Sequence, residues 1–157
     1  MNPFMTIEDI NDANLAAVLG LKVAAAQRAY IETNAQSIQE AMNDHDHDHD
    51  HDWRCYALCE NRQPVGFMMI GAENRTDKYI WLDRFMIGQQ YQGQGLGTQF
   101  LKRAIGFIED HFEVDEIVLS LHTENTHAKY FYGQAGFTDI KRIDETNGEE
   151  IWVYRLT

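Results

Sequence analysis

Residues 90–97 read Gln-Tyr-Gln-Gly-Gln-Gly-Leu-Gly. An apolar segment predicted to be a strand precedes it, and an amphipathic segment predicted to be a helix follows it. Because glycine lacks a Cβ, Gly93, Gly95 and Gly97 allow positive φ angles and a close approach of the backbone to a ligand. Backbone amides at a helix N-terminus, together with the positive end of the helix dipole, bind phosphate groups. The stretch therefore predicts a pyrophosphate-binding turn between a strand and a helix.

Two other phosphate-binding loops do not fit these glycines. A Walker loop ends in Gly-Lys followed by Ser or Thr, and the dinucleotide-binding fingerprint has the spacing Gly-x-Gly-x-x-Gly. The glycines here alternate instead. A glycine-rich turn can also be purely structural, so the turn alone indicates an anion site and says nothing about a reaction.

Hydrophobic periodicity predicts strands and helices along the rest of the chain. The predicted strands cover 5–9, 54–60, 65–71, 78–88, 117–121, 137–144 and 149–156. The predicted helices follow Asp12, with Leu15, Val18 and Leu19 on one face, and cover about 35–42, 95–111 and 126–135. We therefore expect a single domain over residues 1–157, of the α/β (α+β) class.

Composition limits the range of partners. The chain has 157 residues, 44% of them hydrophobic, which suffices for the core of one soluble domain. No apolar run reaches the ~18 residues of a membrane span and no signal peptide is recognisable, so we expect a cytoplasmic protein without a membrane partner. The formal net charge of -12 argues against nucleic acid and favours a cationic small molecule. Cys55 and Cys59 are too far apart along one strand for a disulfide and are expected to be reduced.

Aspartate and histidine alternate strictly from Asp44 to Asp52. The tract has no apolar residue to bury and is expected to form a low-complexity surface loop. Its imidazoles could bind zinc, nickel or copper, and its carboxylates could extend a negative mouth for a cationic substrate. We expect a solvated loop and no metal requirement. The histidines of the tract are His45, His47, His49 and His51.

Two motifs resemble the GNAT acetyltransferase superfamily. The first, Gln90-x-x-Gly93-x-Gly95, matches the family pattern Gln/Arg-x-x-Gly-x-Gly/Ala, and the second reads Glu124-Asn125-x-x-Ala128-x-x-x-Tyr132-x-x-x-Gly136-Phe137. Within the family, bacterial spermidine/spermine N-acetyltransferases are similar at Tyr30-Ile31-Glu32, Trp81-Leu82-Asp83-Arg84-Phe85 and Asn147-Gly148-Glu149. The resemblance implies a GNAT fold, a mixed, mostly antiparallel sheet of about seven strands with helices on both faces, splayed at the cofactor.

The resemblance also implies direct transfer of an acetyl group from acetyl-CoA to a primary amine of a polyamine or short diamine. The pantetheine arm would lie along the end of the strand before the turn, and the phosphates would rest on amides of the turn itself. The residues expected to bind acetyl-CoA are Phe85, Met86, Ile87, Gln92, Gly93, Gln94, Gly95, Leu96, Gly97, Thr98 and Asn125.

Four residues are expected to serve the acceptor amine and the leaving thiolate. Tyr132 is the predicted general acid, because a phenol with a pKa of ~10 keeps its proton at neutral pH yet can pass it to a nearby anion. Asp83 is predicted to bind the amine and take its proton, since strict alternation along a strand puts it on the face of Phe85. Glu32 is expected to hold the distal ammonium, with Tyr30 covering the methylenes. Each could instead serve packing or solvation only.

Other readings of the same sequence remain open. The acceptor could be an antibiotic amine, an amino acid or a protein N-terminus. A module that binds metal or senses CoA without turnover is the non-enzymatic alternative. The resemblance further implies a homodimer.

Overall fold

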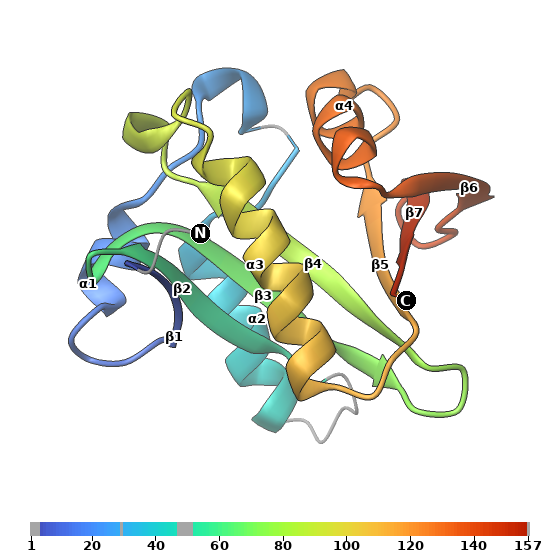
Figure 1. Cartoon of the computed structure of the whole chain (residues 1–157), viewed down its shortest axis with the longest axis horizontal. Helices are drawn as coiled ribbons and strands as arrows, with labels where there is room; N and C mark the ends of the chain where they lie inside the picture. Colours follow the sequence, from blue (N-terminus) through green and yellow to red (C-terminus); the bar gives the residue numbers. More distant parts are fainter. Residues whose placement is uncertain (1–3, 29, 47–51, 157) are drawn as a thin grey trace.

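The computed structural model describes residues 4–28, 30–46 and 52–156, which form both strands and helices (Figure 1). The first elements are β1 (Met5–Asp9), α1 (Leu15–Gly20), η1 (Ala25–Gln27), α2 (Asn34–Asp46), β2 (Arg54–Glu60) and β3 (Gln63–Asn74). They are followed by β4 (Tyr79–Ile87), η2 (Gln89–Tyr91), α3 (Leu96–His111), β5 (Glu116–Leu121), α4 (Thr126–Ala135), β6 (Thr138–Ile143) and β7 (Glu150–Arg155). The predicted strands and helices are therefore present in the predicted order.

The strands form one seven-stranded sheet in the order β1-β2-β3-β4-β5-β7-β6. Neighbouring strands are antiparallel, except that β4 and β5 are parallel. Strands β2 and β3 form an antiparallel hairpin that turns tightly at Asn61 and Arg62, which have φ angles of 51° and 66°. The expected mixed, mostly antiparallel sheet is confirmed.

Strands β4 and β5 pair over only the first part of their length. The pairs are Tyr79 with Glu116, Ile80 with Ile117 and Trp81 with Val118. Beyond them β4 continues to Ile87 and β5 to Leu121, and the two strands diverge (Figure 1). This divergence opens the sheet next to the turn at residues 90–97, called the glycine turn below.

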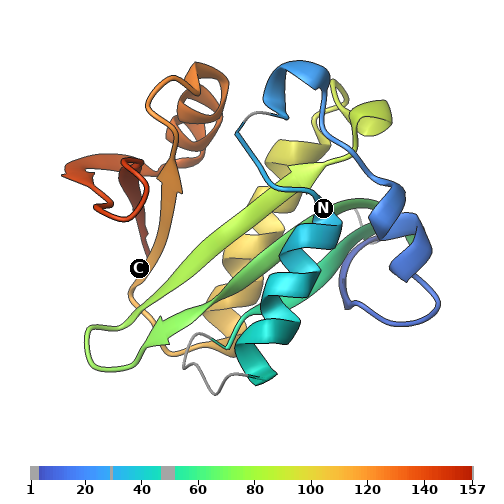
Figure 2. The same cartoon turned by 180° about the vertical axis from the view of Figure 1, so that it is seen from behind.

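Helices cover both faces of the sheet, as expected (Figures 1 and 2). On one face, α3 buries Phe100 and Ile108 completely in a cluster with side chains of the strands. On the other face, α1 and α2 bury Val18 and Ala41 in a second cluster with Phe67 of β3. The sheet, including β4 and β5, is therefore packed between two apolar layers.

The two N-terminal helices differ from the sequence expectation. Helix α1 begins after Asn14 rather than after Asp12. Leu19, expected on the buried face, is 41% exposed, because this six-residue helix buries only Val18. Helix α2 continues through Asp46, so the predicted surface loop over 44–52 is wrong for its first three residues. A helix that has already formed extends at little cost per residue. Residues 47–51 of the histidine and aspartate tract lie outside the described residues, and Asp52 at its end pairs with Arg54 at 2.8 Å.

Strand β4 contains a bulge at Asp83. Met69 of β3 pairs with Arg84 and Ile70 pairs with Leu82, so Asp83 has no partner in β3. A bulge interrupts the alternation of side chains and often lies beside a functional site. The alternation that put Asp83 on the face of Phe85 is interrupted here, and the side chains of Asp83 and Arg84 contact each other although the residues are consecutive.

Candidate functional site

A cleft of about 590 Å³ opens where β4 and β5 diverge. Its walls come from β4, β5, α4, the glycine turn, the segment before α2 and the turn between β6 and β7. Of the residues expected to form the site, those that line the cleft are Tyr30, Glu32, Asp83, Phe85, Met86, Ile87, Gln92, Gly93, Gly95, Gly97, Thr98, Asn125 and Tyr132. Gln94 and Leu96 do not line it, and Leu96 is 5% exposed because it packs into the core with α3.

The glycine turn has the backbone geometry of an anion site. Gly93 and Gly95 have φ angles of 81° and 78°, in the left-handed region that favours glycine. Gly95 is the N-cap of α3, where the structure shows no side-chain cap on the first amides. Gln92 fixes the turn, because its Nε2 donates to the carbonyl oxygen of Ile87 at 2.8 Å. The first amides of α3 are thus held in place and open to an anion.

Gly95→Ala is expected to weaken CoA binding about tenfold, because a side chain in the left-handed region costs about 1–2 kcal/mol and would shift these amides. Calorimetric titration with CoA measures the effect. Gly106→Ala is the control, since Gly106 lies on the exposed side of α3 with nothing within 4 Å of an added Cβ. It should leave CoA binding unchanged and stabilise the helix by about 0.5–1 kcal/mol. Equal CoA affinity in both variants would contradict an anion site at Gly95.

Phe131 of α4 connects the glycine turn to β4. Its ring stacks on Phe85 with centroids 6.1 Å apart and an interplanar angle of 28°. A Cβ on Gly97 would lie 3.3 Å from the same ring, so glycine at this position lets α4 approach the turn. Sequence reasoning did not single out Phe131, because the run Tyr130-Phe131-Tyr132 is equally typical of helix packing.

Asn125 caps helix α4, which carries Tyr132. The Asn125 Oδ1 accepts a hydrogen bond from the Ala128 amide at 3.2 Å and so caps the helix. Tyr132 is 8% exposed, and its ring packs edge-on against Phe131 and Phe137. Burial raises the pKa of the Tyr132 phenol above its ordinary value, which keeps the hydroxyl protonated at neutral pH. The Tyr132 hydroxyl on the cleft wall is therefore a hydrogen-bond donor at neutral pH.

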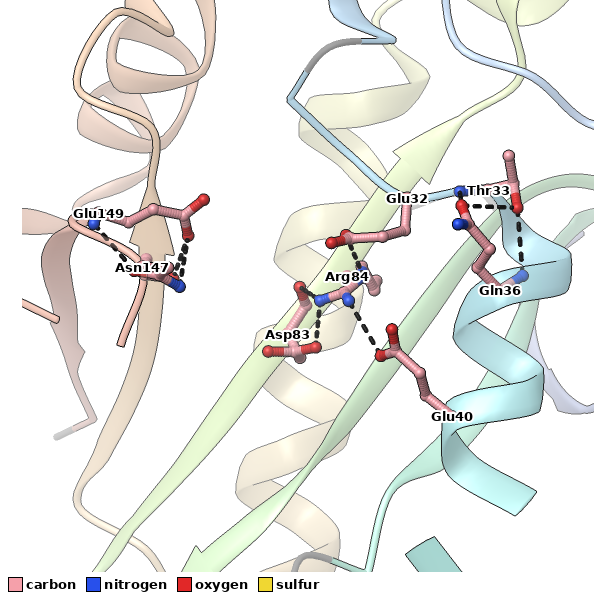
Figure 3. Close-up of polar contacts among 9 residues, drawn as sticks. Glu32, Thr33, Gln36, Glu40, Asp83, Arg84, Asn147 and Glu149 are labelled. Carbon is pink, nitrogen blue, oxygen red and sulfur yellow. Dashed lines mark hydrogen bonds and ion pairs between the residues drawn. The ribbon is translucent and has the colours of Figure 1, made fainter. Parts of the chain in front are cut away.

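Charged side chains gather on the β4 side of the cleft (Figure 3). The Arg84 guanidinium lies 2.8 Å from Glu32 and 3.1 Å from Glu40, and it contacts the carboxylate of Asp83. Burial raises the pKa of Asp83 to about 6, while Arg84 lowers it. The carboxylates of Glu40, Glu32 and Glu149 raise it further. Asp83 is therefore ionised at pH 7 and still basic enough to accept a proton.

A further carboxylate stands across the gap from Asp83 (Figure 3). Glu149 Oε1 accepts hydrogen bonds from Ser120 Oγ at 2.7 Å and from Asn147 Nδ2 at 3.4 Å. Both donors are neutral, so Glu149 adds a negative charge to this wall of the cleft.

Tyr30, predicted to cover the methylenes of the acceptor amine, packs on His122, which follows β5. The centroids of the two rings are 5.1 Å apart.

Sequence reasoning missed Arg84 and Glu149 as members of the site. Both lie inside segments that resemble the family, but the sequence assigned neither of them a role in the site. In the sequence, the feature that could have identified Arg84 is its position directly after the predicted catalytic acid Asp83. For Glu149, the signal is an acid that immediately follows an Asn-Gly turn.

Neither a metal site nor a membrane-spanning helix is found among the described residues. Within the part of the chain that the structure describes, no group of three or more His, Cys, Asp or Glu residues is placed to hold a metal ion. The side chains of the histidine tract lie outside that part. No described helix is long and apolar enough to cross a membrane. Cys55 and Cys59 are both free, as expected.

Comparison with known proteins extends these findings. Residues 22–137 match the model of the acetyltransferase (GNAT) family. The chain is 32% identical to the spermine/spermidine N(1)-acetyltransferase of Bacillus subtilis (strain 168), over 97% of this chain and 99% of that protein. The spermidine N-acetyltransferase of Vibrio cholerae, solved with CoA and spermine, has a TM-score of 0.72 and 18% identity over 97% of this chain and 94% of that one. The paia N-acetyltransferase of Thermoplasma acidophilum, solved with coenzyme A, has a TM-score of 0.69 and 14% identity over 97% and 99%. The chain belongs to the acetyltransferase (GNAT) family.

Proposed function

We propose that this acetyltransferase transfers an acetyl group from acetyl-CoA to a primary amine of a polyamine or short diamine. The observation that carries the proposal is the composition of one cleft. Its glycine turn offers amides to an anion, and its other walls carry the carboxylates of Glu32, Asp83 and Glu149. An anion site and a group of carboxylates in the same cavity suit a phosphorylated donor and a cationic acceptor.

The donor half of the cleft fits CoA. The amides at Gln92–Thr98 would hold the phosphates, with Asn125 nearby on α4. Beyond Trp81, no described strand pairs with β4 on the β5 side. The backbone groups on this edge at Phe85–Ile87, apart from the Ile87 carbonyl oxygen that Gln92 holds, can therefore pair with the pantetheine arm. An amide on this edge would also stabilise negative charge on the thioester oxygen. Acetyl-CoA supplies the acetyl group when bound.

The acceptor half supplies the proton transfers. Asp83 takes a proton from the ammonium, directly or through water, so that the free amine can attack the thioester carbon. A carbon–nitrogen bond forms, the carbon–sulfur bond breaks, and Tyr132 gives its proton to the departing sulfur. The nitrogen loses its second proton as it becomes an amide, and this proton returns through water to the Tyr132 oxygen. Glu32 and Glu149 attract the other nitrogen of the acceptor, and Tyr30 covers its methylenes.

The relatives support this choice of acceptor. The Bacillus subtilis relative is named for spermine and spermidine, and it aligns with this chain over nearly its full length. A homodimer, implied by the family resemblance, and a cytoplasmic location, expected from the sequence, remain predictions.

A panel of amines tests the proposal by release of the CoA thiol. Spermine, spermidine, a short diamine, an amino acid, an aminoglycoside and a peptide with a free N-terminus are compared at equal concentrations. We expect kcat/KM for the polyamines or the diamine to exceed that for the amino acid and the peptide at least tenfold, because a second ammonium meets a second carboxylate. Preference for the aminoglycoside, the amino acid or the peptide would contradict a polyamine or diamine as the acceptor. Absence of turnover with every amine would favour a CoA-sensing role.

A further inference from the structure

Arg84 holds three carboxylates that come from three segments of the chain (Figure 3). Its Nε lies 2.8 Å from Glu32 in the segment before α2, in an ion pair rather than an aligned hydrogen bond. Its Nη2 lies 3.1 Å from Glu40 of α2, and its Nη1 contacts Asp83 in the bulge of β4. The Arg84 side chain is only 13% exposed. A guanidinium removed from water to this extent is stable only with such partners.

This arrangement fixes the acceptor side of the cleft. The bulge leaves Asp83 without a partner in β3, so the β-sheet ladder does not orient it, whereas the Arg84 guanidinium contacts its carboxylate. The same guanidinium forms an ion pair with Glu32, which lies in the same segment as Tyr30. Without a cation between them, the carboxylates would repel one another and separate.

The planar shape of the side chain matters as much as its charge. Arginine presents five N–H donors in a fixed fork and can engage several carboxylates in defined directions. Lysine carries the same charge as a single compact ammonium and cannot hold three carboxylates in this geometry. A role in positioning and a role in charge alone therefore predict different behaviour for a lysine substitution.

We propose that Arg84 is a positioning residue for acetyl transfer, which orients Asp83 and Glu32 toward the acceptor amine by holding both, together with Glu40, on one guanidinium. This inference rests on the proposed function, because it assumes an amine in the cleft. Arg84 itself takes no part in bond making or breaking.

The charges that face Asp83 allow a sharp test by pH. Arg84 lowers the pKa of Asp83, whereas Glu40, Glu32 and Glu149 raise it. The Cys55 thiol on β2 is also close to Arg84, but burial raises its pKa to about 12, so it remains neutral at the pH values of interest. Loss of Arg84 should therefore move the acidic limb of the pH profile to higher pH, and loss of Glu40 should move it to lower pH.

The experiment compares Arg84→Gln, Arg84→Lys and Glu40→Gln with wild type, using full pH profiles of kcat and kcat/KM for the best amine. Arg84→Gln is expected to lower kcat about tenfold, because misplaced reacting groups cost rate even when binding survives. Arg84→Lys is expected to fold and to restore little of this loss. Glu40→Gln changes an exposed residue outside the cleft lining, so it should fold normally and shift the acidic limb downward. Arg155→Gln is the control, because Arg155 is 80% exposed on β7 and its removal changes the net charge by the same amount.

Two kinetic outcomes would overturn the proposal. Removal of Arg84 adds negative charge to the cleft, so a purely electrostatic role predicts a lower KM for the polyamine with unchanged kcat in Arg84→Gln. Full activity in Arg84→Lys would likewise show that charge alone suffices.

Hydrogen exchange of residues 30–33 is measured in parallel and does not depend on turnover. Faster exchange in Arg84→Gln than in Arg155→Gln supports the positioning role, and equal exchange contradicts it. If wild type acetylates no amine, the proposed function fails, and hydrogen exchange alone then decides whether Arg84 holds this segment.

Discussion

Tyr132→Phe is expected to lower kcat about 10²- to 10³-fold and to leave the dissociation constant of CoA nearly unchanged. The substitution removes one hydroxyl and keeps the ring that packs against Phe131 and Phe137. The lost group is the proposed proton donor to the departing sulfur, so chemistry slows while the donor still binds. Steady-state release of the CoA thiol gives kcat, and calorimetry with CoA gives the affinity.

Tyr130→Phe provides a matched control for this prediction. Tyr130 lies on the same helix and is 71% exposed, so loss of its hydroxyl should not affect kcat. The pKa of the Tyr132 phenol is raised above its ordinary value, so no alkaline limb from this residue is expected below pH ~10. Wild-type turnover in Tyr132→Phe would remove Tyr132 from the reaction and leave its ring a packing role.

Much of the fold could be predicted from local patterns. The strands and the helix α3 follow from hydrophobic periodicity, because each element must bury one face or stripe against its neighbours. Gly136 ends α4 with a φ of 108°, as expected for a residue that follows a helix in the left-handed region. The end of α2 was less predictable, because its last turn consists of the polar residues 43–46 and no apolar periodicity marks it.

The site could be predicted in part only, because its polar contacts join residues far apart in the sequence. The glycine turn and α4 each carry a local motif, so Gly93, Gly95 and Tyr132 could be singled out. Arg84 meets a glutamate 44 positions away, and Glu149 is held by a serine 29 positions away. No spacing rule connects such pairs. The bulge that brings Asp83 and Arg84 together depends on the register between β3 and β4, which periodicity alone does not specify.

Asp83→Asn is expected to lower kcat/KM for the amine about 10²- to 10³-fold at neutral pH. Asparagine matches the shape of aspartate but cannot accept the proton that the acceptor ammonium must lose. In wild type the pKa of Asp83 is raised to about 6, so the basic form is present above that pH. Activity should fall as the pH drops through about 6, and this limb should be absent in Asp83→Asn. Thiol release measured from pH 5 to pH 9 on both proteins gives the two profiles.

Asp77→Asn is the control for the loss of one carboxylate, since Asp77 is exposed in the turn between β3 and β4 and is not part of the cleft lining. A loss smaller than tenfold in Asp83→Asn, with the acidic limb retained, would mean that another group takes the proton. The next acceptors to test are water and Glu149, whose carboxylate is held by the neutral side chains of Ser120 and Asn147. The double variant Asp83→Asn/Glu149→Gln separates these two. If Glu149 takes over, the second substitution removes the acidic limb, whereas proton loss to water leaves the pH dependence of the amine itself.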